Sequence, residues 1–546
     1  MIKILQIISG LILLLAFTCD SKEVNTIAVE ECVQGPVRNG ELLVLDSTKI
    51  NDFIARHSES TFWKSRLSSF YKKRLYAYAW MNEKGLDESA AKFMHLLDTE
   101  FKEGAVKDDL HSLYTLLSSG DCIRNNTDSL FIELELLLSA HFFNYAHRNW
   151  KGVSETKSME LGWFVDRKKL DYEALLDTLL TNQSAFDDNE PVYRQYALLK
   201  KQLAKYVEME KNGGWPLIDN NSGKLKVGDS SPLLVDVKKR LFITKELECK
   251  DFSPLFTEDL GYAIKLFQEQ HGLKPDSVLG PRTIKEMNVS VHQRIEQILI
   301  NMERCRWVPK DFKGDYLMVN IPDYKLSVYN NDKVDWTCKV VLGKQSTSTV
   351  IFNDELEYVV FSPYWNVPPS IIQNEMLPEI EENDNYFVEH NMEIVAQDNV
   401  TIIDPSSIKW RKYESEKFPY TIRQRPGAEN PLGGVKFLFP NSYNIYLHDT
   451  SAKGLFDKTT RTFSHGCIRI EKPFDLARHL LQSDTAWTDD KILEAMNLGE
   501  EKYVKLKTKT PVYIVYFTAW VDTYGVIQFR EDIYGHDAKM KALLLL

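Results

Sequence analysis

The chain is 546 residues long, which is too long for a single hydrophobic core and predicts three or four domains. Its residues are 43% hydrophobic and 27% charged, as in an ordinary globular protein. The formal net charge of −11 and the lack of a basic block argue against nucleic acid as a partner, because proteins hold that polyanion through clustered lysine and arginine.

The first 18 residues are predicted to be an export signal. Their apolar run, Ile4 to Phe17, is too short to cross a membrane and is typical of a signal-peptide core. The sequence that ends at Cys19 resembles a lipoprotein processing box, in which this cysteine becomes the lipidated first residue; ordinary signal cleavage is the alternative. We therefore expect a protein exported to the periplasm and held to a membrane by its lipid, with residues 19–45 as a tether.

Residues 46–215 are predicted to form an α-helical domain, because apolar residues recur there at helical spacing. A break at Asn212-Gly-Gly-Trp-Pro216 starts the next unit, residues 216–300, which we predict to be a small three-helix bundle. Thr257 is placed to cap one helix of this bundle, and Gly272 is placed to end it. The stretch 263–283 resembles the peptidoglycan-binding repeat of wall enzymes, which implies either a wall-binding module or a spacer.

Residues 305–540 change to a period of two, which predicts a mainly β domain, either a sandwich or an open barrel. The strand-like stretches after Pro511 are expected to return to its sheet. A polar passage at about 370–420 is too long for a hairpin loop and is predicted to be a lid. Its flanks, Trp365-Asn-Val-Pro368 and Gln424-Arg-Pro-Gly427, are expected to belong to the sheet. The predicted fold class is therefore multidomain α+β.

The seven cysteines are scattered without the CxxC spacing of a zinc site or the pattern of a disulfide framework. We expect no metal and no cofactor. One or two disulfides stay open, and the sequence does not pair them. The cysteines are Cys19, Cys32, Cys122, Cys249, Cys305, Cys338 and Cys467.

The stretch from His448 to Cys467 is predicted to carry the chemistry. Cys467 ends the tetrapeptide Ser464-His465-Gly466-Cys467, and His448 ends a strand-like stretch upstream. An imidazole within hydrogen-bond reach can deprotonate a thiol and give a thiolate–imidazolium pair. Gly466 permits a tight turn, and the backbone N–H groups of Gly466 and Cys467 are candidates to hold an oxyanion. A small buried cysteine without function is the alternative.

The wider pattern resembles the signature of the YkuD-type L,D-transpeptidases, in which a histidine is followed, after a gap, by Ser/Thr-His-Gly-Cys. The stretches Phe361-Ser-Pro-Tyr-Trp365-Asn-Val-Pro368 and Leu432-Gly-Gly-Val-Lys-Phe extend the resemblance to the large, multidomain branch of that family. It implies that residues 46–215 are a helical scaffold domain and that the insertion at about 370–420 caps the active site.

The resemblance also implies a peptidoglycan L,D-transpeptidase that acts in cell-wall biogenesis on stem peptides. Cys467 would attack the third residue of a tetrapeptide stem and expel the terminal D-alanine, and the side-chain amine of a second stem would then form a 3→3 crosslink. His448 would act as base and then as acid, and the backbone carbonyl of Asp449 would orient its ring. His465 would shape the turn rather than act as a second base.

Four further residues are candidates to contact the substrate, with a purely structural role as the alternative for each. The guanidinium of Arg469 suits a stem carboxylate. Family motifs often have Asn in place of Arg469 and Gly in place of Asp449, which leaves these two roles open. Carbapenems, which acylate the cysteine of this family, are expected inhibitors. The four candidates are Tyr446, Arg469, Ser464 and Trp365.

Two other functions remain open at the level of the sequence. With water as the acceptor, the same nucleophile would make the protein an L,D-carboxypeptidase or an enzyme that releases proteins from the wall. With an idle thiol, the protein would be a wall-binding lipoprotein. The products formed from a disaccharide-tetrapeptide would separate the three.

Overall fold

The computed structural model describes residues 44–57, 62–82, 85–100, 109–118, 127–167, 169–181, 190–219, 223–248, 250–312, 314–414 and 418–544. The predicted export signal, the predicted lipidation site Cys19 and nearly all of the predicted tether lie outside these residues. Within these ranges, no helix combines the length and the apolar composition needed to cross a bilayer.

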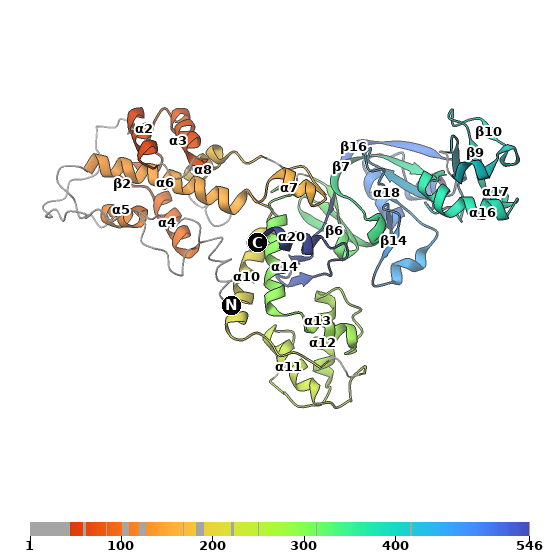
Figure 1. Cartoon of the computed structure of the whole chain (residues 1–546), viewed down its shortest axis with the longest axis horizontal. Helices are drawn as coiled ribbons and strands as arrows, with labels where there is room; N and C mark the ends of the chain where they lie inside the picture. The colour runs from red at the N-terminus through yellow and green to blue at the C-terminus, as the bar shows by residue number, and fades with distance from the viewer. Residues whose placement is uncertain are drawn as a thin grey trace.

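The N-terminal region is helical, as predicted, and forms an elongated body on the red-to-orange side of Figure 1. Its core is aromatic, with Phe70 and Phe143 packed edge to face at 5.9 Å between ring centroids. The elements are α2 (Ser47–Arg56), α3 (Phe62–Lys73), β1 (Met81–Asn82), β2 (Gly85–Leu86), α4 (Glu88–Glu100), α5 (Asp109–Ser118), α6 (Thr127–Trp150), α7 (Glu155–Glu160), β3 (Trp163–Phe164), α8 (Tyr172–Thr181) and α10 (Gln195–Lys211).

The helical region also contributes to the β domain, which the sequence did not predict. Strand β3 pairs in parallel with β7 (Ile351–Phe361), so that Trp163 lies opposite Ile351. The Trp163 indole also packs edge to face on Trp307 at 5.4 Å between ring centroids. The helical region and the β domain therefore share one apolar core.

The predicted three helices of the small bundle are α11 (Leu233–Ile243), α12 (Glu258–Gln270) and α13 (Pro281–Met287), which enclose a core of their own. The Thr257 side chain accepts the Leu260 N–H at 3.3 Å and so caps α12, as predicted. Gly272, just past the end of α12, has a φ of +65°.

The predicted boundary at residue 300 is wrong, because the next helix, α14 (Val291–Arg304), does not belong to the bundle. A capping box between Ser290 and Gln293 starts α14 as a separate helix. Its buried side chains, including Ile295 and Ile298, lie in the core that α10 shares with the β domain. In Figure 1, α10 and α14 run side by side at the junction of the helical region, the bundle and the β domain.

The β domain is built on a ten-stranded sheet whose strand order is β12-β13-β15-β6-β5-β4-β16-β7-β3, with β14 on β6. An additional antiparallel pairing of β12 with β7 closes eight of these strands into a ring. The remaining strands of the sheet are β4 (Tyr316–Asn320), β5 (Lys325–Asn330), β6 (Lys333–Gly343), β12 (Val435–Leu438), β13 (Leu447–His448), β14 (Thr462–Ser464), β15 (Ile468–Ile470) and β16 (Lys502–Val515).

The insertion folds as a subdomain with a core of its own, at the end of the molecule farthest from the helical region in Figure 1. We call residues 365–424 the cap. Its elements are β8 (Trp365–Asn366), α15 (Pro369–Ile371), η3 (Ile372–Met376), α16 (Leu377–Glu382), α17 (Tyr386–Glu389), β9 (Met392–Val395), β10 (Ile402–Ile403), η4 (Pro405–Ser407), η5 (Trp410–Glu414) and β11 (Thr421–Gln424).

The flanks of the insertion were predicted to lie in the main sheet, and this prediction is wrong. Strands β8 and β11 pair with each other, Trp365 opposite Gln424, within a separate four-stranded sheet of order β10-β9-β11-β8. Both flanks carry apolar side chains, such as Val367 and Ile422, that complete the cap core. Burying them inside the cap keeps them from water.

The stretch after β16 also departs from the prediction, since only β16 returns to the main sheet. Strands β17 (Ala519–Val521) and β18 (Ile527–Phe529) form a separate hairpin, and Gln195 on α10 donates to the Val521 carbonyl at 2.8 Å. The other elements are η1 (Ile321–Asp323), η2 (Gln345–Thr347), η6 (Lys453–Asp457), α18 (Pro473–Leu481), α19 (Asp489–Met496) and α20 (His536–Leu544).

Candidate active site

Two short parallel strands bring the predicted catalytic residues together. In the pairing of β13 with β15, Leu447 lies opposite Ile468 and His448 lies opposite Arg469. Leu447 and Ile468 belong to the main core. Because side chains alternate along a strand, His448 and Arg469 point to the other face of the sheet.

Tyr446 and Cys467 come two residues before His448 and Arg469 and continue the same face. The rings of Tyr446 and His448 lie 5.6 Å apart between centroids. The four side chains therefore form a two-by-two array, which we call the catalytic array, with Cys467 beside Tyr446 and diagonal to His448. The pairing of β13 with β15 therefore brings together two motifs that are separated in the sequence.

The turn that presents Cys467 is closed by Ser464. The Ser464 hydroxyl donates to the Cys467 carbonyl at 2.6 Å and accepts the Gly466 N–H at 3.1 Å. Gly466 has a φ of +120°, a conformation that side chains rarely adopt. Ser464 is only 2% exposed, so its predicted contact with substrate is replaced by a structural role.

The same bond corrects the predicted oxyanion site. Because the Gly466 N–H is bound by the Ser464 hydroxyl, it is not free to stabilise a charged oxygen. Of the two predicted backbone donors, the Cys467 N–H is the one left.

Cys467 is half-buried, and its Sγ lies 3.6 Å from the Asn444 carbonyl oxygen. Burial raises the pKa of the thiol, and the N–H and hydroxyl of Tyr446 and the charge of Arg469 oppose that rise. The net direction is upward, so the resting residue is a neutral thiol.

His448 is buried, and its Nδ1 donates to the backbone carbonyl of Asp449 at 2.5 Å. This bond places the proton on Nδ1 and leaves Nε2 as the basic nitrogen. Burial, and then the charges of Arg469 and Lys436, lower the pKa of His448 to about 3. The resting imidazole is therefore neutral.

The array thus differs from the predicted thiolate–imidazolium pair. No hydrogen bond joins Cys467 to the His448 ring within the described residues, and both groups are neutral for the same reason, desolvation. Proton transfer from thiol to imidazole would then accompany attack on a substrate carbonyl rather than precede it.

The Asp449 carboxylate holds the end of β13 in place. It accepts the backbone N–H groups of Thr450 at 2.7 Å and Gly434 at 3.0 Å, and it pairs with Lys453. A Cβ on Gly433, which has a φ of +61°, would overlap this carboxylate. The lack of a side chain at Gly433 therefore makes room for Asp449, whose backbone carbonyl accepts the hydrogen bond from His448.

Lys436, which the sequence analysis missed, lies on the other side of His448. It is the cross-strand partner of His448 on β12, is 8% exposed, and pairs with Glu501 at 3.1 Å between Nζ and Oε1. The sequence did contain a signal for Lys436. In Val435-Lys436-Phe437 the lysine alternates with apolar residues, which places it on the face of the strand that points away from the core. His448 is therefore flanked by two cations in one row across the sheet.

Arg469, the other cation of this row, keeps donors unused. Its Nε is buried and has no hydrogen-bond partner among the described residues. Burial lowers the pKa of the guanidinium, and the sulfur of Cys467 opposes this. A guanidinium with an unused donor beside Cys467 is suited to an anionic group of a ligand.

The other two predicted residues connect the cap to the turn. His465 is exposed, and its Nε2 lies 2.9 Å from Oε1 of Glu375 on η3 of the cap. Trp365 is half-buried and packs against the cap core, so the structure does not bring it into the catalytic array. The cap therefore contacts the turn through His465, which stands two positions before Cys467.

The cysteines in the described ranges, Cys305, Cys338 and Cys467, are all free. Burial raises the pKa of Cys338 to about 11 and that of Cys305 further still. Neither is a reactive thiol at neutral pH. No cluster of three or more potential metal ligands occurs in the part of the chain that the structure describes.

The depressed pKa of His448 predicts acid sensitivity. The unfolded chain takes up a proton at this residue near pH 6.5, whereas the folded chain does so near pH 3, so its contribution to stability is full above pH 6.5 and is lost as the pH falls toward 3. When the pH falls from 7.5 to about 4.5, the free energy of unfolding measured with urea should decrease by about 2 kcal/mol more for the wild type than for His448→Gln. Equal losses would contradict the neutral, buried imidazole.

Comparison with known proteins identifies the domain that contains this site. The model of the L,D-transpeptidase catalytic domain, YkuD, matches residues 314–514, which include the catalytic array, and the model of a scaffold domain matches residues 65–203. A Haemophilus influenzae protein named "Putative L,D-transpeptidase" is 34% identical over 258 residues, 47% of this chain and 50% of that protein. The match thus spans about half the length of this relative.

Two solved structures are similar over part of the chain. An L,D-transpeptidase of Xylanimonas cellulosilytica has 12% identity and a TM-score of 0.18, covering 54% of this chain and 98% of that one. An L,D-transpeptidase (Yku) of Stackebrandtia nassauensis has 15% identity and a TM-score of 0.20, covering 55% and 96%. The assignment rests on the two domain models, by which the chain contains a YkuD-type L,D-transpeptidase catalytic domain at residues 314–514 and a scaffold domain at residues 65–203.

Proposed function

We propose that this protein is a peptidoglycan L,D-transpeptidase that forms 3→3 crosslinks with Cys467 as its nucleophile. The observation that carries the proposal is the catalytic array, where a half-buried thiol and a histidine with an unprotonated Nε2 share one face of the sheet inside the matched catalytic domain. The substrate class comes from the family.

In the first half-reaction, the Cys467 sulfur would attack the carbonyl of the third residue of a tetrapeptide stem. His448 Nε2 takes the thiol proton as the carbon–sulfur bond forms, and the imidazolium then gives this proton to the nitrogen of the leaving D-alanine. The product is a thioester acyl-enzyme. The Asp449 carbonyl supports the charged imidazolium, because Nδ1 keeps its hydrogen bond throughout.

In the second half-reaction, the side-chain amine of another stem attacks the thioester. His448 accepts a proton from this amine, the carbon–sulfur bond breaks, and the proton returns to the sulfur. The amide that forms is the crosslink, and the enzyme regains its neutral pair. Splitting the exchange into two steps lets one nucleophile serve both substrates.

The two cations that flank His448 affect this chemistry in two ways. Their charges keep the resting imidazole neutral and therefore able to accept a proton, and they oppose the imidazolium that then forms, which the Asp449 carbonyl stabilises. Arg469, with its unused donor, is placed to hold a carboxylate of the donor stem. Lys436 already has a partner in Glu501, so we assign it the electrostatic part only.

The N-terminal sequence supports a proposal for the location of the protein in the cell. We propose an exported protein anchored to a membrane through a lipid on Cys19, with the three-helix bundle as a wall-binding module. The apolar run before Cys19 and the likeness of the bundle to peptidoglycan-binding repeats support this. The measurement that tests the anchor is the share of the full chain in the membrane fraction, compared with that of Cys19→Ala.

The test of the activity is product analysis by mass spectrometry after incubation of the full chain with a disaccharide-tetrapeptide. Crosslinked dimers with release of D-alanine would support the transpeptidase. Tripeptides alone would assign the hydrolase, and unchanged substrate would leave a wall-binding protein with an idle thiol. The three outcomes differ in mass and cannot be confused.

A further inference from the structure

Part of the support for Cys467 comes from outside the matched catalytic domain, which ends at residue 514. Tyr534, in the segment before α20, is 7% exposed. Its hydroxyl donates to the Gly343 carbonyl at 2.7 Å and accepts the Thr349 N–H at 3.4 Å. The Tyr534 hydroxyl thus forms hydrogen bonds to both ends of the loop 343–349 that follows β6.

This loop in turn holds the turn that presents Cys467. The Thr349 hydroxyl donates to the Gly466 carbonyl at 2.9 Å, and it also accepts the Gly343 N–H at 3.0 Å. The Lys344 N–H and the Thr347 hydroxyl both donate to the Ser464 carbonyl, at 3.0 and 3.2 Å. Ser464 and Gly466, which carry the internal hydrogen bonds of the turn, are therefore held in place by the loop.

Gly343 shows how closely the loop and the turn approach each other. A Cβ at this position would overlap the Thr347 carbonyl oxygen and would lie 2.9 Å from the Thr349 nitrogen and 3.1 Å from the Gly466 Cα. No side chain separates the loop from the turn here. A displacement of the loop would therefore pass directly to the backbone beside Cys467.

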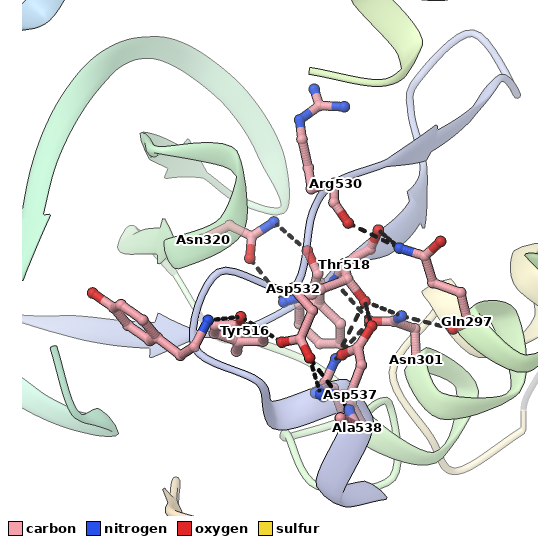
Figure 2. A network of polar contacts seen from close by, with 12 residues as sticks. Gln297, Asn301, Asn320, Tyr516, Thr518, Arg530, Asp532, Asp537 and Ala538 are labelled. Carbon is pink, nitrogen blue, oxygen red and sulfur yellow. Dashed lines mark hydrogen bonds and ion pairs between the residues drawn. The ribbon is translucent and has the colours of Figure 1, made fainter. Parts of the chain in front are cut away.

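Tyr534 is itself fixed by the polar network of Figure 2. Its N–H donates to the Tyr516 hydroxyl at 2.9 Å, and that hydroxyl donates to Asp532 at 2.7 Å. The other Asp532 oxygen accepts the N–H groups of Asp537 at 2.9 Å and Ala538 at 3.2 Å, at the start of α20.

The same network reaches α14. The Asp537 carboxylate pairs with Arg304 at 2.6 Å and accepts the Thr518 hydroxyl at 2.6 Å. Asn301 on α14 donates to that hydroxyl at 2.7 Å and accepts the Thr518 N–H at 2.9 Å. The network is partly buried, Asp537 is paired with Arg304 and Asp532 accepts several hydrogen bonds, so the network provides a rigid base for Tyr534.

We propose that Tyr534 is a positioning residue for Cys467, acting through Gly343 and Thr349 on the Ser464–Cys467 turn. The proposal rests on the proposed function of Cys467 as nucleophile. A misplacement of about 1 Å at a reacting group can cost about a hundredfold in rate. Loss of one hydroxyl at residue 534 should therefore slow acylation without changing the groups that react.

The experiment compares Tyr534→Phe with Tyr316→Phe in the full chain. Tyr316 is an equally suitable tyrosine, 1% exposed, whose hydroxyl donates to Asp332 at 3.3 Å, away from the turn. The probe is a carbapenem, and the readouts are the rate constant of covalent acylation at saturation and the concentration that gives half of that rate. We expect Tyr534→Phe to lower the rate constant about tenfold or more, with the half-saturating concentration and the melting temperature close to those of Tyr316→Phe.

A second pair of variants tests the path through the loop. Thr349→Val removes the bond to the Gly466 carbonyl and should slow acylation at least as much, while Thr349→Ser, which keeps the hydroxyl, should recover most of the rate. Because both residues act on one turn, the double variant Tyr534→Phe/Thr349→Val should be little slower than the slower single variant.

Three results would overturn the positioning role: acylation of Tyr534→Phe at the rate of Tyr316→Phe, equal rates for Thr349→Val and Thr349→Ser, or losses that multiply in the double variant. If the wild-type chain were not acylated and formed neither dimers nor tripeptides from a disaccharide-tetrapeptide, the proposed function itself would fail. The two failures are thus distinguished by the behaviour of the wild type.

Discussion

Replacing Cys467 by alanine is expected to abolish acyl-enzyme formation while the protein stays folded. The sulfur is the only atom lost, and it lies in a half-buried turn outside the main core. Removal of a nucleophile lowers turnover by about 10³-fold or more. After incubation with a carbapenem, the wild type should gain the mass of one drug molecule, and Cys467→Ala should gain none.

His448→Gln should lower the acylation rate by a similar order, because the amide has no nitrogen that can accept the thiol proton. Cys338→Ala is the matched control, a change at another free cysteine whose pKa burial raises to about 11. This control should still be acylated. An adduct that peptide mapping placed on Cys338 or Cys305, or one that survived in Cys467→Ala, would refute the nucleophile assignment.

Excision of the cap is expected to change the ratio of crosslinked dimer to tripeptide more than it changes the acylation of Cys467. Residues 367–422 can be replaced by Asn-Gly, because the residues that remain on either side, Asn366 and Arg423, are cross-strand partners that a two-residue turn can join. The cap has a core of its own, and of the residues that form or cover this core the excision leaves only Trp365.

Without the cap, the thioester should be open to water, and products should shift from crosslinked dimer toward tripeptide. Acylation by a small carbapenem should persist, since the catalytic array is built from β13 and β15. Mass spectrometry of the muropeptides gives the dimer-to-tripeptide ratio.

Glu375→Gln is a milder version of the same change, because it removes the charge that faces His465 and keeps the cap. It should shift the ratio in the same direction by a smaller amount. Glu379→Gln, a change at an exposed cap carboxylate on α16, is the control and should leave the ratio alone. If cap excision left the ratio unchanged, the cap would be a surface elaboration, and amine would be selected over water by other means.

Local sequence determined the features whose physics is local. Apolar spacing of three and four residues produced the N-terminal helices, and alternation produced the β domain. Thr257 caps α12 because a hydroxyl just before a helix satisfies one of its free N–H groups. The motif around Cys467 and His448 indicated the family, and the domain model agrees.

Tertiary structure decided everything that depends on burial or on partners distant in the chain. Desolvation makes the thiol and the imidazole neutral, and no residue type in the motif reveals how much water surrounds it. The pairing of β8 with β11 moves both flanks of the insertion into the cap, and Tyr534 contacts the loop that holds the Cys467 turn from a segment far along the chain. These features depend on contacts between segments that are far apart in the sequence. Such contacts produce no periodic pattern of residues from which they could be predicted.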